Sequence, residues 1–450
     1  MAVLDRLRHP LAAVAFAVLL TMPWVVSDLT GAAEGYTTTT VVTVAGVAVL
    51  GASFLLAWGA ETAEKDVPRA FAIAVLAVLA VAPEYAVDAL YAFNAGQFAG
   101  TERGMEAANL AVANMTGANR ILIGLGWSGI ALFTVYRAGS GADEAVEKRD
   151  GFLASRVNLD PDISTEIAFL FLATMWAFLV PVGGGIDIVD MGVLVGLYVL
   201  YIAVILKGDV EEHEEQVGVP AYFQAKARSV RVPIVLALFA YSGAMIFTAV
   251  EPFAHGLEVL GEDFGIPSFF MIQWIAPLAS ESPELIVVAY LVNKARSTAG
   301  FNALISSKLN QWTLLIGTLV VVYSIGLGTY GALPFDAKQA AEIWITAAQS
   351  FFALAVLVNF NISIREAVLL LVLFASQVGI EFAIIRDVAV GGAPIPFSSI
   401  DLLHGYTVLY MLIGIALFVS RWGALQRLFR RLVVTMRGAF GDGDGAQPSD

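Results

Sequence analysis

Long apolar runs, each about the length of a membrane-spanning helix, alternate with short polar segments along most of the chain. The run around residues 107–137 is long for one crossing and is predicted to break near Thr116-Gly117. The pattern therefore predicts an all-α integral membrane protein with about 12 spans. The predicted spans are 11–29, 39–60, 70–92, 107–137, 163–182, 186–206, 232–254, 266–292, 299–326, 340–358, 364–385 and 403–420.

The composition agrees with this pattern and excludes several classes of protein. The chain has 450 residues, of which 58% are hydrophobic and only 14% charged, and its mean hydropathy is +0.77. Soluble domains carry about 25% charged residues. The absence of cysteine excludes disulfides, thiolate metal sites and cysteine nucleophiles. A net charge of −14 leaves no basic footprint for nucleic acid, so no nucleic-acid partner is expected.

Lysine and arginine predict how the spans are oriented, because cytoplasmic segments of membrane proteins are enriched in both. With the N-terminus inside, only Arg103, Lys338 and Arg386 fall in outer segments, and Arg120 and Lys308 fall within spans. The other basic residues are then cytoplasmic. We expect a multi-pass protein of the plasma membrane with both termini in the cytoplasm.

The charged segment 207–231 divides the ten central spans into two groups of five. An odd number of spans per group gives the groups opposite orientations, as in an inverted-topology repeat. We therefore expect a ten-helix core of two inverted five-helix repeats, plus one extra transmembrane helix at each end. The predicted domains are 1–38 (extra helix and outer loop), 39–206 (first repeat), 207–231 (acidic cytoplasmic linker), 232–386 (second repeat), 387–420 (extra helix) and 421–450 (cytoplasmic tail).

Two similar stretches place a proline and a glutamate within apolar runs: Ala82-Pro83-Glu84-Tyr85, and Ser280-Glu281-Ser282-Pro283-Glu284-Leu285. Proline in a helix interior frees the carbonyl four residues earlier, here those of Leu79 and Ala279. A carboxylate inside the bilayer is costly and by default marks a functional site. Two such interruptions in corresponding halves predict the binding site of a secondary transporter.

The stretch from Phe264 to Leu285 resembles the alpha-repeat of the sodium/calcium exchanger family, which belongs to the calcium/cation antiporter superfamily. That family has a Gly-Thr-Ser-x-Pro-Glu core followed by a helix of Gly-Asn-x-x-Gly-Ser-Asn type. Residues 113–119 (Ala-Asn-Met-Thr-Gly-Ala-Asn) are similar to the second element, and residues 302–310 are a weaker counterpart. The resemblance covers roughly 40–386. It implies four helices meeting at a central cation site, with Glu84 and Glu284 as its chief ligands.

The oxygen-bearing side chains near these motifs are those that a hard cation such as Ca²⁺ prefers. There are two alternatives. The glutamates could form ion pairs with basic residues that serve only helix packing, and the Asn and Ser residues could serve only to pack transmembrane helices against one another. The candidate cation ligands are Glu84, Asp88, Asn114, Asn119, Ser280, Glu281, Glu284, Ser306, Ser307 and Asn310. We expect no resident cofactor; the partners would be the transported Ca²⁺, Na⁺ or H⁺ and the lipid bilayer.

The sequence also departs from the family pattern. Leu79-Ala80-Val81 stands where Gly-Thr-Ser is expected, and Glu281 replaces a serine. Asp88 follows Glu84 by four residues and Glu281 precedes Glu284 by three, so each pair shares a helix face. Close carboxylates favour a site that exchanges protons. The alternative for Asp88 is that it faces the outer water.

Arg120 and Lys308 introduce positive charge beside the Asn and Ser positions of the two halves. A fixed positive charge there could occupy a cation position and reduce the number of ions bound. Alternatively, each neutralises an extra acid, Asp88 or Glu281, for structural reasons.

The sequence therefore predicts a secondary active cation antiporter, not an enzyme, that exchanges Na⁺ or H⁺ against a cation, with Ca²⁺ implied by the resemblance. Monovalent cation/proton exchange on the same scaffold is an alternative, as is a sensor or channel that does not transport by exchange. Gly126-Trp127-Ser128-Gly129, with His255 or His404 as base, offers a third possibility, an intramembrane serine hydrolase.

The segment after Arg421 is a basic amphipathic stretch that contains Arg427, Arg430, Arg431 and Arg437. Such stretches are attracted to anionic lipid.

Overall fold

Eleven helices among the described residues are long and apolar enough to cross a membrane. The computed structural model describes residues 9–66, 81–138, 144–151, 153–207, 217–390 and 396–440. Eleven of the twelve predicted spans are thereby confirmed. The twelfth, 70–92, is described only from residue 81, where a shorter helix begins.

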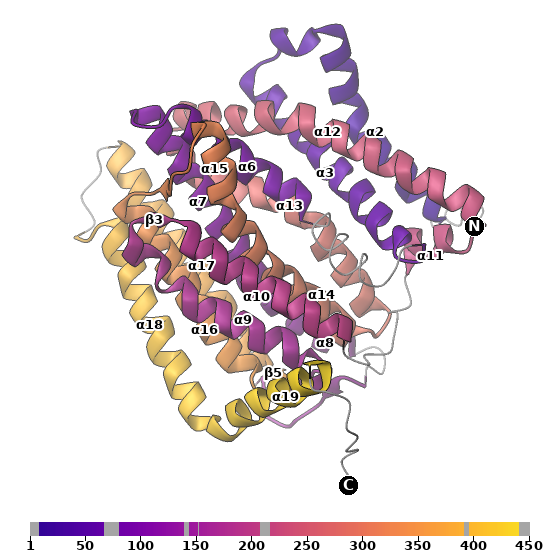
Figure 1. The fold of residues 1–450 in the computed structure, drawn as a ribbon, viewed down its shortest axis with the longest axis vertical. Helices are drawn as coiled ribbons and strands as arrows, with labels where there is room; N and C mark the ends of the chain where they lie inside the picture. Colours follow the sequence, from indigo (N-terminus) through magenta and orange to yellow (C-terminus); the bar gives the residue numbers. More distant parts are fainter. Residues whose placement is uncertain are drawn as a thin grey trace.

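The helices lie side by side, apart from a helix at the C-terminal end that crosses the others (Figure 1). The first half contains α2 (Pro10–Thr30), η1 (Ala32–Gly35), α3 (Thr38–Ala63), α6 (Ala82–Gln97), α7 (Glu102–Ile121), η3 (Leu122–Trp127), α8 (Ser128–Ala138), β1 (Val146–Glu147), β2 (Arg156–Asn158), η4 (Pro161–Ile163), α9 (Ser164–Ala177), η5 (Val180–Gly183), β3 (Gly185–Ile186) and α10 (Ile188–Lys207). The second half contains α11 (Gly218–Gln224), α12 (Arg228–Asp263), α13 (Ser268–Asn293), α14 (Ser297–Asn310), η6 (Gln311–Leu315), α15 (Ile316–Leu327), β4 (Leu333–Pro334), α16 (Ala337–Leu357), β5 (Asn361–Ser363), α17 (Ile364–Val390), α18 (Ser399–Ser420) and α19 (Trp422–Phe440).

Two small antiparallel sheets show that the halves have opposite orientations. Strand β2, between the third and fourth spans of the first half, pairs with β5, between the fourth and fifth spans of the second. Strand β3, between the fourth and fifth spans of the first half, pairs with β4, between the third and fourth of the second. Consecutive spans end on alternate faces of the membrane. These loops can therefore meet only if one repeat is inverted relative to the other, as predicted.

The helix contacts follow the same symmetry. The first helices of the two repeats, α3 and α12, pack together along their length. Helix α6 packs against α15, and α13 packs against α7, so each Pro-Glu helix lies against the third helix of the other half. Gly96 permits the contact between α6 and α15, because a Cβ at this position would lie 2.2 Å from the carbonyl oxygen of Tyr323.

The third helix of each half contains a π-helical segment, η3 in the first and η6 in the second. The predicted break near Thr116-Gly117 is wrong, because α7 continues to Ile121 and the irregular turn follows it. The Thr116 hydroxyl donates to the carbonyls of Val112 and Ala113 without ending the helix. π-helical segments occur mostly as single turns within α-helices, frequently at functional sites.

Gly117 serves the contact between α7 and α13 instead. A Cβ at this position would lie 1.8 Å from the carbonyl oxygen of Gln273. Gly117→Ala should therefore force the two helices apart and destabilise the fold by about 1–3 kcal/mol, the usual cost of overpacking. Gly129→Ala is the control, since a Cβ there meets nothing within 4 Å. Thermal unfolding in detergent compares the two, and equal stability of both variants would contradict this packing.

An ion pair just beyond the end of α3 ties it to the start of α12. Arg231 donates from Nε to Oδ2 of Asp66 at 2.6 Å and from Nη2 to Oδ1 at 2.5 Å. The hydrogen bonds from Arg231 hold the pKa of Asp66 below its ordinary value of 3.8. A carboxyl group whose pKa is lower in the folded than in the unfolded protein stabilises the folded state at every pH above its unfolded pKa. This stabilisation is lost as the pH falls through the pKa of the folded state.

Asp66→Asn should therefore lower the free energy of unfolding at pH 7 by about 1.5–3 kcal/mol, the usual range for hydrogen bonds to charged groups. The difference between the variant and the parent protein should shrink as the pH is lowered below 3.8. Unfolding followed from pH 7 to pH 3 tests this, and a difference that is as large at pH 3 as at pH 7 would contradict it.

Candidate functional site

Glu84 lies in the first turn of α6 and is 2% exposed. Helix α6 begins at Ala82, after Val81 with φ −95° and ψ 7°, which is not helical. Pro83 thus occupies the first turn of α6, where its missing N–H is tolerated. The prediction had placed it in the interior of a helix, and the described residues do not show that. The carbonyl of Leu79 lies outside the described residues. Glu84 thus lies at the start of α6, and its carboxyl group faces Gln311 of the second half.

The structure brings Glu84 together with Glu281 of α13 through a residue that the sequence did not indicate, Gln311. The Gln311 side-chain nitrogen donates to Oε2 of Glu84 at 2.6 Å and to Oε1 of Glu281 at 2.5 Å. Gln311 begins η6, four residues after Ser307 and one after Asn310, the last candidate predicted on this helix. Gln311 follows the candidate Ser307 by four residues, so the two share a helix face, and this spacing could have identified Gln311 from the sequence.

Glu284 lies on the same side of α13 and interacts with both Glu281 and Ser307. This part of the predicted ligand set therefore converges. Ser280 donates to the Pro277 carbonyl at 3.2 Å, and Ser306 lies beside Tyr201 of α10, so these two hydroxyls have partners outside the carboxyl group cluster. We call Glu84, Glu281, Glu284 and Gln311 the central cluster.

Asp88, one turn after Glu84 on α6, pairs with Asn114 of α7. Asn114 donates from Nδ2 to Oδ1 of Asp88 at 2.8 Å. Asp88 is 0% exposed, so it is buried in the protein and does not face outer water, which was the alternative. Its charge lies close enough to Glu84 to interact with it. Asp88 and Asn114 thus extend the central cluster toward α7.

Lys308 brings a positive charge to the edge of the central cluster. Its ammonium nitrogen donates to the backbone oxygen of Asn119 at 3.1 Å and to Oδ1 of Asn119 at 3.0 Å. It also interacts electrostatically with Glu84 and Glu281. Lys308 is fully buried. Asn119 is therefore bound to Lys308 in this structure and does not point an oxygen at the carboxyl groups.

Arg120 points away from the central cluster and belongs to a separate buried network. It donates to Oε2 of Glu342 on α16 at 2.6 Å and to Gln377 on α17. Lys338 also pairs with Glu342, at 2.9 Å, and with Glu381, at 3.3 Å. Arg120 thus neutralises Glu342, and neither of the two acids suggested by the sequence.

Several buried oxygens around the central cluster have no hydrogen-bond partner among the described residues. All are acceptors, and they come from α6, α7, α13 and η6. They are Oε1 of Glu84, Oδ2 of Asp88, Oδ1 of Asn114, Oε2 of Glu284 and Oε1 of Gln311. Buried polar atoms are normally paired, so unpaired oxygens of this kind fit a cargo that is a cation.

These oxygens do not form a ready-made metal site. In the described parts of the chain, no group of three or more Asp, Glu, His or Cys side chains has an arrangement that could hold a metal ion. The Gln311 amide accounts for this, because its N–H groups lie between the carboxylates of Glu84 and Glu281. A cation could bind between them only after that amide moved or turned its oxygen inward.

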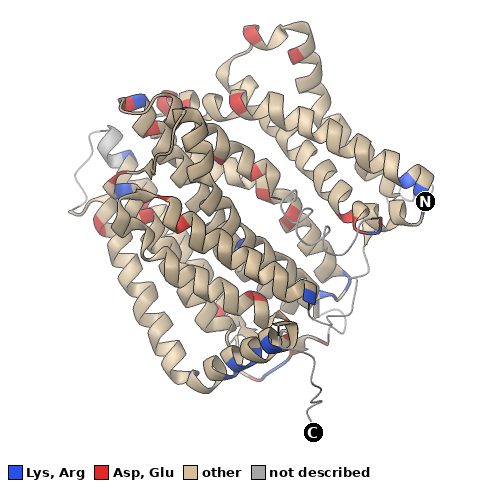
Figure 2. Cartoon of the chain, viewed as in Figure 1, with Lys and Arg blue, Asp and Glu red and all other residues tan. Residues whose placement is uncertain are grey.

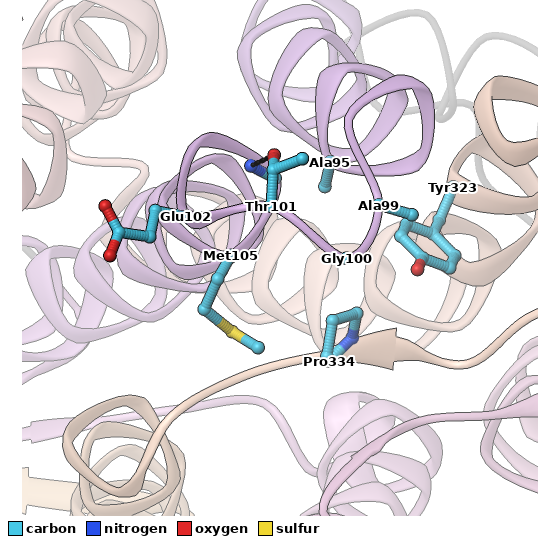
Figure 3. Close-up of a pocket in the computed structure, with 9 residues that line it drawn as sticks. Ala95, Ala99, Gly100, Thr101, Glu102, Met105, Tyr323 and Pro334 are labelled. Carbon is cyan, nitrogen blue, oxygen red and sulfur yellow. Dashed lines mark hydrogen bonds between the residues drawn. The ribbon is translucent and has the colours of Figure 1, made fainter.

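A pocket of about 300 Å³ lies elsewhere, at the turn between α6 and α7 (Figure 3). It is lined by Ala95, Ala99, Gly100, Thr101, Glu102, Gly104, Met105, Tyr323 and Pro334. None of the central cluster residues lines it. Glu102 points away from the other labelled side chains, so the pocket presents little chemistry of its own.

Ser128 has no catalytic surroundings. Its hydroxyl is buried and donates to the carbonyl oxygen of Gly124 within the helix. His255 lies next to Glu258, and His404 packs against the ring of Trp344. Within the described ranges, no hydrogen bond joins Ser128 to either histidine. The arrangement gives no support to a serine hydrolase.

Comparison with known proteins agrees with this fold. A family model described as "Sodium/calcium exchanger protein" matches residues 11–207 and 234–383. No curated protein matches the chain. The solved structure of an H⁺/Ca²⁺ exchanger, CAX, is 39% identical over 95% of this chain and 98% of its own, with a TM-score of 0.82.

A second solved structure, of the Ca²⁺/H⁺ antiporter protein YfkE, is 14% identical over 82% of this chain and 99% of its own, with a TM-score of 0.56. At that identity it supports the fold alone. The family model covers most of the chain and both Pro-Glu helices. The chain is therefore a multi-pass membrane protein that belongs to the sodium/calcium exchanger family.

Proposed function

We propose that this protein is a secondary antiporter that exchanges Ca²⁺ for H⁺, with the central cluster as its cation site. The observation that carries the proposal is the meeting of three buried carboxyl groups from two inverted halves, with unpartnered oxygens around them. The similarity to an H⁺/Ca²⁺ exchanger over nearly the whole chain supports the choice of Ca²⁺ and of H⁺.

Charge balance explains how such a site would couple the two ions. Glu84, Glu281 and Glu284 carry three negative charges when all are ionised, and either one divalent cation or two protons can neutralise two of these charges. Buried carboxylates without a counter-ion are costly, so an emptied site would take up protons. Cation and protons thereby exclude each other, which is the requirement for exchange.

Gln311 and Lys308 hold the site in its cation-free form. The two N–H bonds from Gln311 keep Glu84 and Glu281 together. Rotation of that amide would present Oε1, which has no described partner now, as a cation ligand. Lys308 lies beside the same carboxyl groups and reduces the net negative charge that a bound cation would meet.

Access would alternate between the membrane faces by movement of flanking helices against the Pro-Glu helices. Helices α2, α3 and α12 lie together on one side of the molecule (Figure 1), and α3 and α12 contact α13. The domain limits inferred from the sequence, the cytoplasmic termini and the plasma-membrane location remain part of this proposal.

The test is transport by the purified protein in proteoliposomes. An imposed pH gradient should drive uptake of radioactive Ca²⁺ with no Na⁺ present, and addition of Ca²⁺ to protein in detergent should release protons. Uptake that follows a Na⁺ gradient at constant pH would indicate Na⁺/Ca²⁺ exchange instead. Na⁺ or K⁺ flux without Ca²⁺ flux would indicate monovalent exchange. Either outcome would overturn the proposal.

A further inference from the structure

Helix α19 is the most basic segment of an acidic protein. Its 19 residues contain four arginines and no Asp or Glu, whereas the whole chain carries a net charge of −14. Figure 2 shows the basic residues as blue segments along this helix, at one end of the molecule. The charge of α19 is therefore opposite in sign to that of the chain as a whole and would attract an anionic partner.

The position of α19 does not depend on these arginines. The preceding residue, Arg421, donates to the carbonyl oxygens of Ala355 and Val356 at 3.0 and 2.7 Å and also pairs with Glu366. These bonds fix the corner between α18 and α19 to the end of α16. Along α19, the buried residues Ala424, Leu428 and Leu432 lie on the side that packs against α9 and α10.

Three of the four arginines point outward without partners. Arg427, Arg430 and Arg437 are exposed and make no hydrogen bond or ion pair with the described parts of the protein. At 100° per residue they occupy an arc of about 80° on the helix. Arg431 differs, because its guanidinium lies over the ring of Phe360 at 5.6 Å. We call Arg427, Arg430 and Arg437 the basic face.

An exposed apolar strip runs beside the basic face. Trp422, Val433 and Phe440 are 58%, 45% and 46% exposed. Their spacing places them within about 20° of one another on the helix. Exposed apolar and basic side chains on adjacent strips are typical of helices that lie in the interface of a membrane.

Both ends of α19 lie where membrane-spanning helices end. The span α18 ends at Ser420, two residues before α19 begins. At the other end, Phe440 stacks under the ammonium group of Lys207, the last residue of the span α10, at 4.4 Å. The helix therefore lies between the ends of two candidate membrane spans, where the surface of a bilayer is expected.

We propose that the basic face of α19 is a binding surface for anionic lipid headgroups, with Trp422, Val433 and Phe440 buried among the lipids beside it. The arginines supply charge-assisted hydrogen bonds to phosphate, which guanidinium groups match well. The surface is separate from the central cluster, so the inference stands whether or not the transported ions are those proposed above.

The absence of native cysteine makes a direct test possible. Gln426→Cys places one thiol beside the basic face, where a fluorescent donor can be attached. Energy transfer to trace headgroup-labelled phosphatidylglycerol and, separately, to labelled phosphatidylcholine then measures which lipid gathers there in proteoliposomes. We expect enrichment of the anionic lipid on the order of fivefold, the effect of one well-placed basic residue, or more. It should fall in 1 M salt, where the Debye length is about 3 Å.

Two variants separate charge from structure. The triple variant Arg427→Gln, Arg430→Gln, Arg437→Gln should lose the enrichment, and the triple lysine variant should keep most of it. Thermal unfolding in neutral detergent should be the same for both, because neither changes Arg421 or the buried side of α19. Equal enrichment in the parent and the glutamine variant would overturn the proposal. So would salt-dependent shielding of the label in detergent without lipid, which would indicate a protein segment such as the acidic run at 211–215.

Discussion

Glu84→Gln should abolish Ca²⁺/H⁺ exchange while leaving the protein folded. The substituted amide keeps an oxygen that can accept the 2.6 Å hydrogen bond from Gln311, so the contact between α6 and η6 survives. The variant loses the negative charge that both the cation and the proton require. Substitution of residues that only hydrogen-bond to a metal ligand lowers metal affinity or activity by about 10- to 100-fold, and loss of the ligand's own charge should cost more. We therefore expect pH-driven Ca²⁺ uptake in proteoliposomes to fall at least on the order of 100-fold.

Glu284→Gln should have a similar effect, because Glu284 belongs to the same cluster. Glu166→Gln is the matched control: Glu166 is another carboxyl group on a membrane helix, it accepts a 3.1 Å hydrogen bond from Tyr201, and it lies outside the central cluster. The control should retain uptake. Normal exchange by both the Glu84 and Glu284 variants would contradict the proposed site, even if the parent protein transports Ca²⁺.

Arg120→Gln should destabilise the protein by about 3–5 kcal/mol, the usual cost of leaving a buried charge without its partner. Arg120 is 1% exposed, and its side chain joins α7 to Glu342 of α16 and Gln377 of α17. The guanidinium also lies over the ring of Trp274 on α13, at 4.9 Å. Removal of the charge therefore affects three neighbouring helices. Chemical or thermal unfolding in detergent measures the loss.

The double variant Arg120→Gln, Glu342→Gln should recover part of this stability, because the buried carboxylate that lost its Arg120 partner is then removed as well. Recovery will be partial, since Lys338 loses its 2.9 Å partner. Arg149→Gln is the exposed control. Its ion pair with Glu147 has side chains that are 42% and 43% exposed, and such pairs contribute about 0–1 kcal/mol. A loss no larger for Arg120 than for Arg149 would contradict the structural role.

The fold was predictable to a large extent because membrane-spanning helices have a strong sequence pattern. The apolar runs gave the spans, and the odd number per half gave the inverted arrangement, which the pairing of β2 with β5 and β3 with β4 confirms. The strands themselves, each of two or three residues, were too short to leave a pattern. The π-helical segments were missed because they depend on the packing of neighbouring helices, not on local composition.

The site was predictable in part. The prolines and glutamates indicated the right helices, but residue identity alone did not reveal which polar side chains face each other. Lys308 is bonded to Asn119 from the other half, 189 positions away in the sequence, and Arg120 is bonded to Glu342, 222 positions away. No local pattern carries that information. Gln311 was missed because it lies one residue beyond the stretch 302–310 that resembles the family motif.

The pairing of β2 with β5 has a consequence for how the protein is made. Arg156 finds its strand partner in Ser363, roughly 200 residues later in the chain, and such long-range pairing is slow to form. The loop before α9 emerges from the ribosome long before its partner. Strand β2 can pair with β1 of the same loop at once. Its other edge must wait in the membrane until the second repeat has been inserted almost to its last helix, and a stop codon placed before residue 361 would leave that edge without a partner.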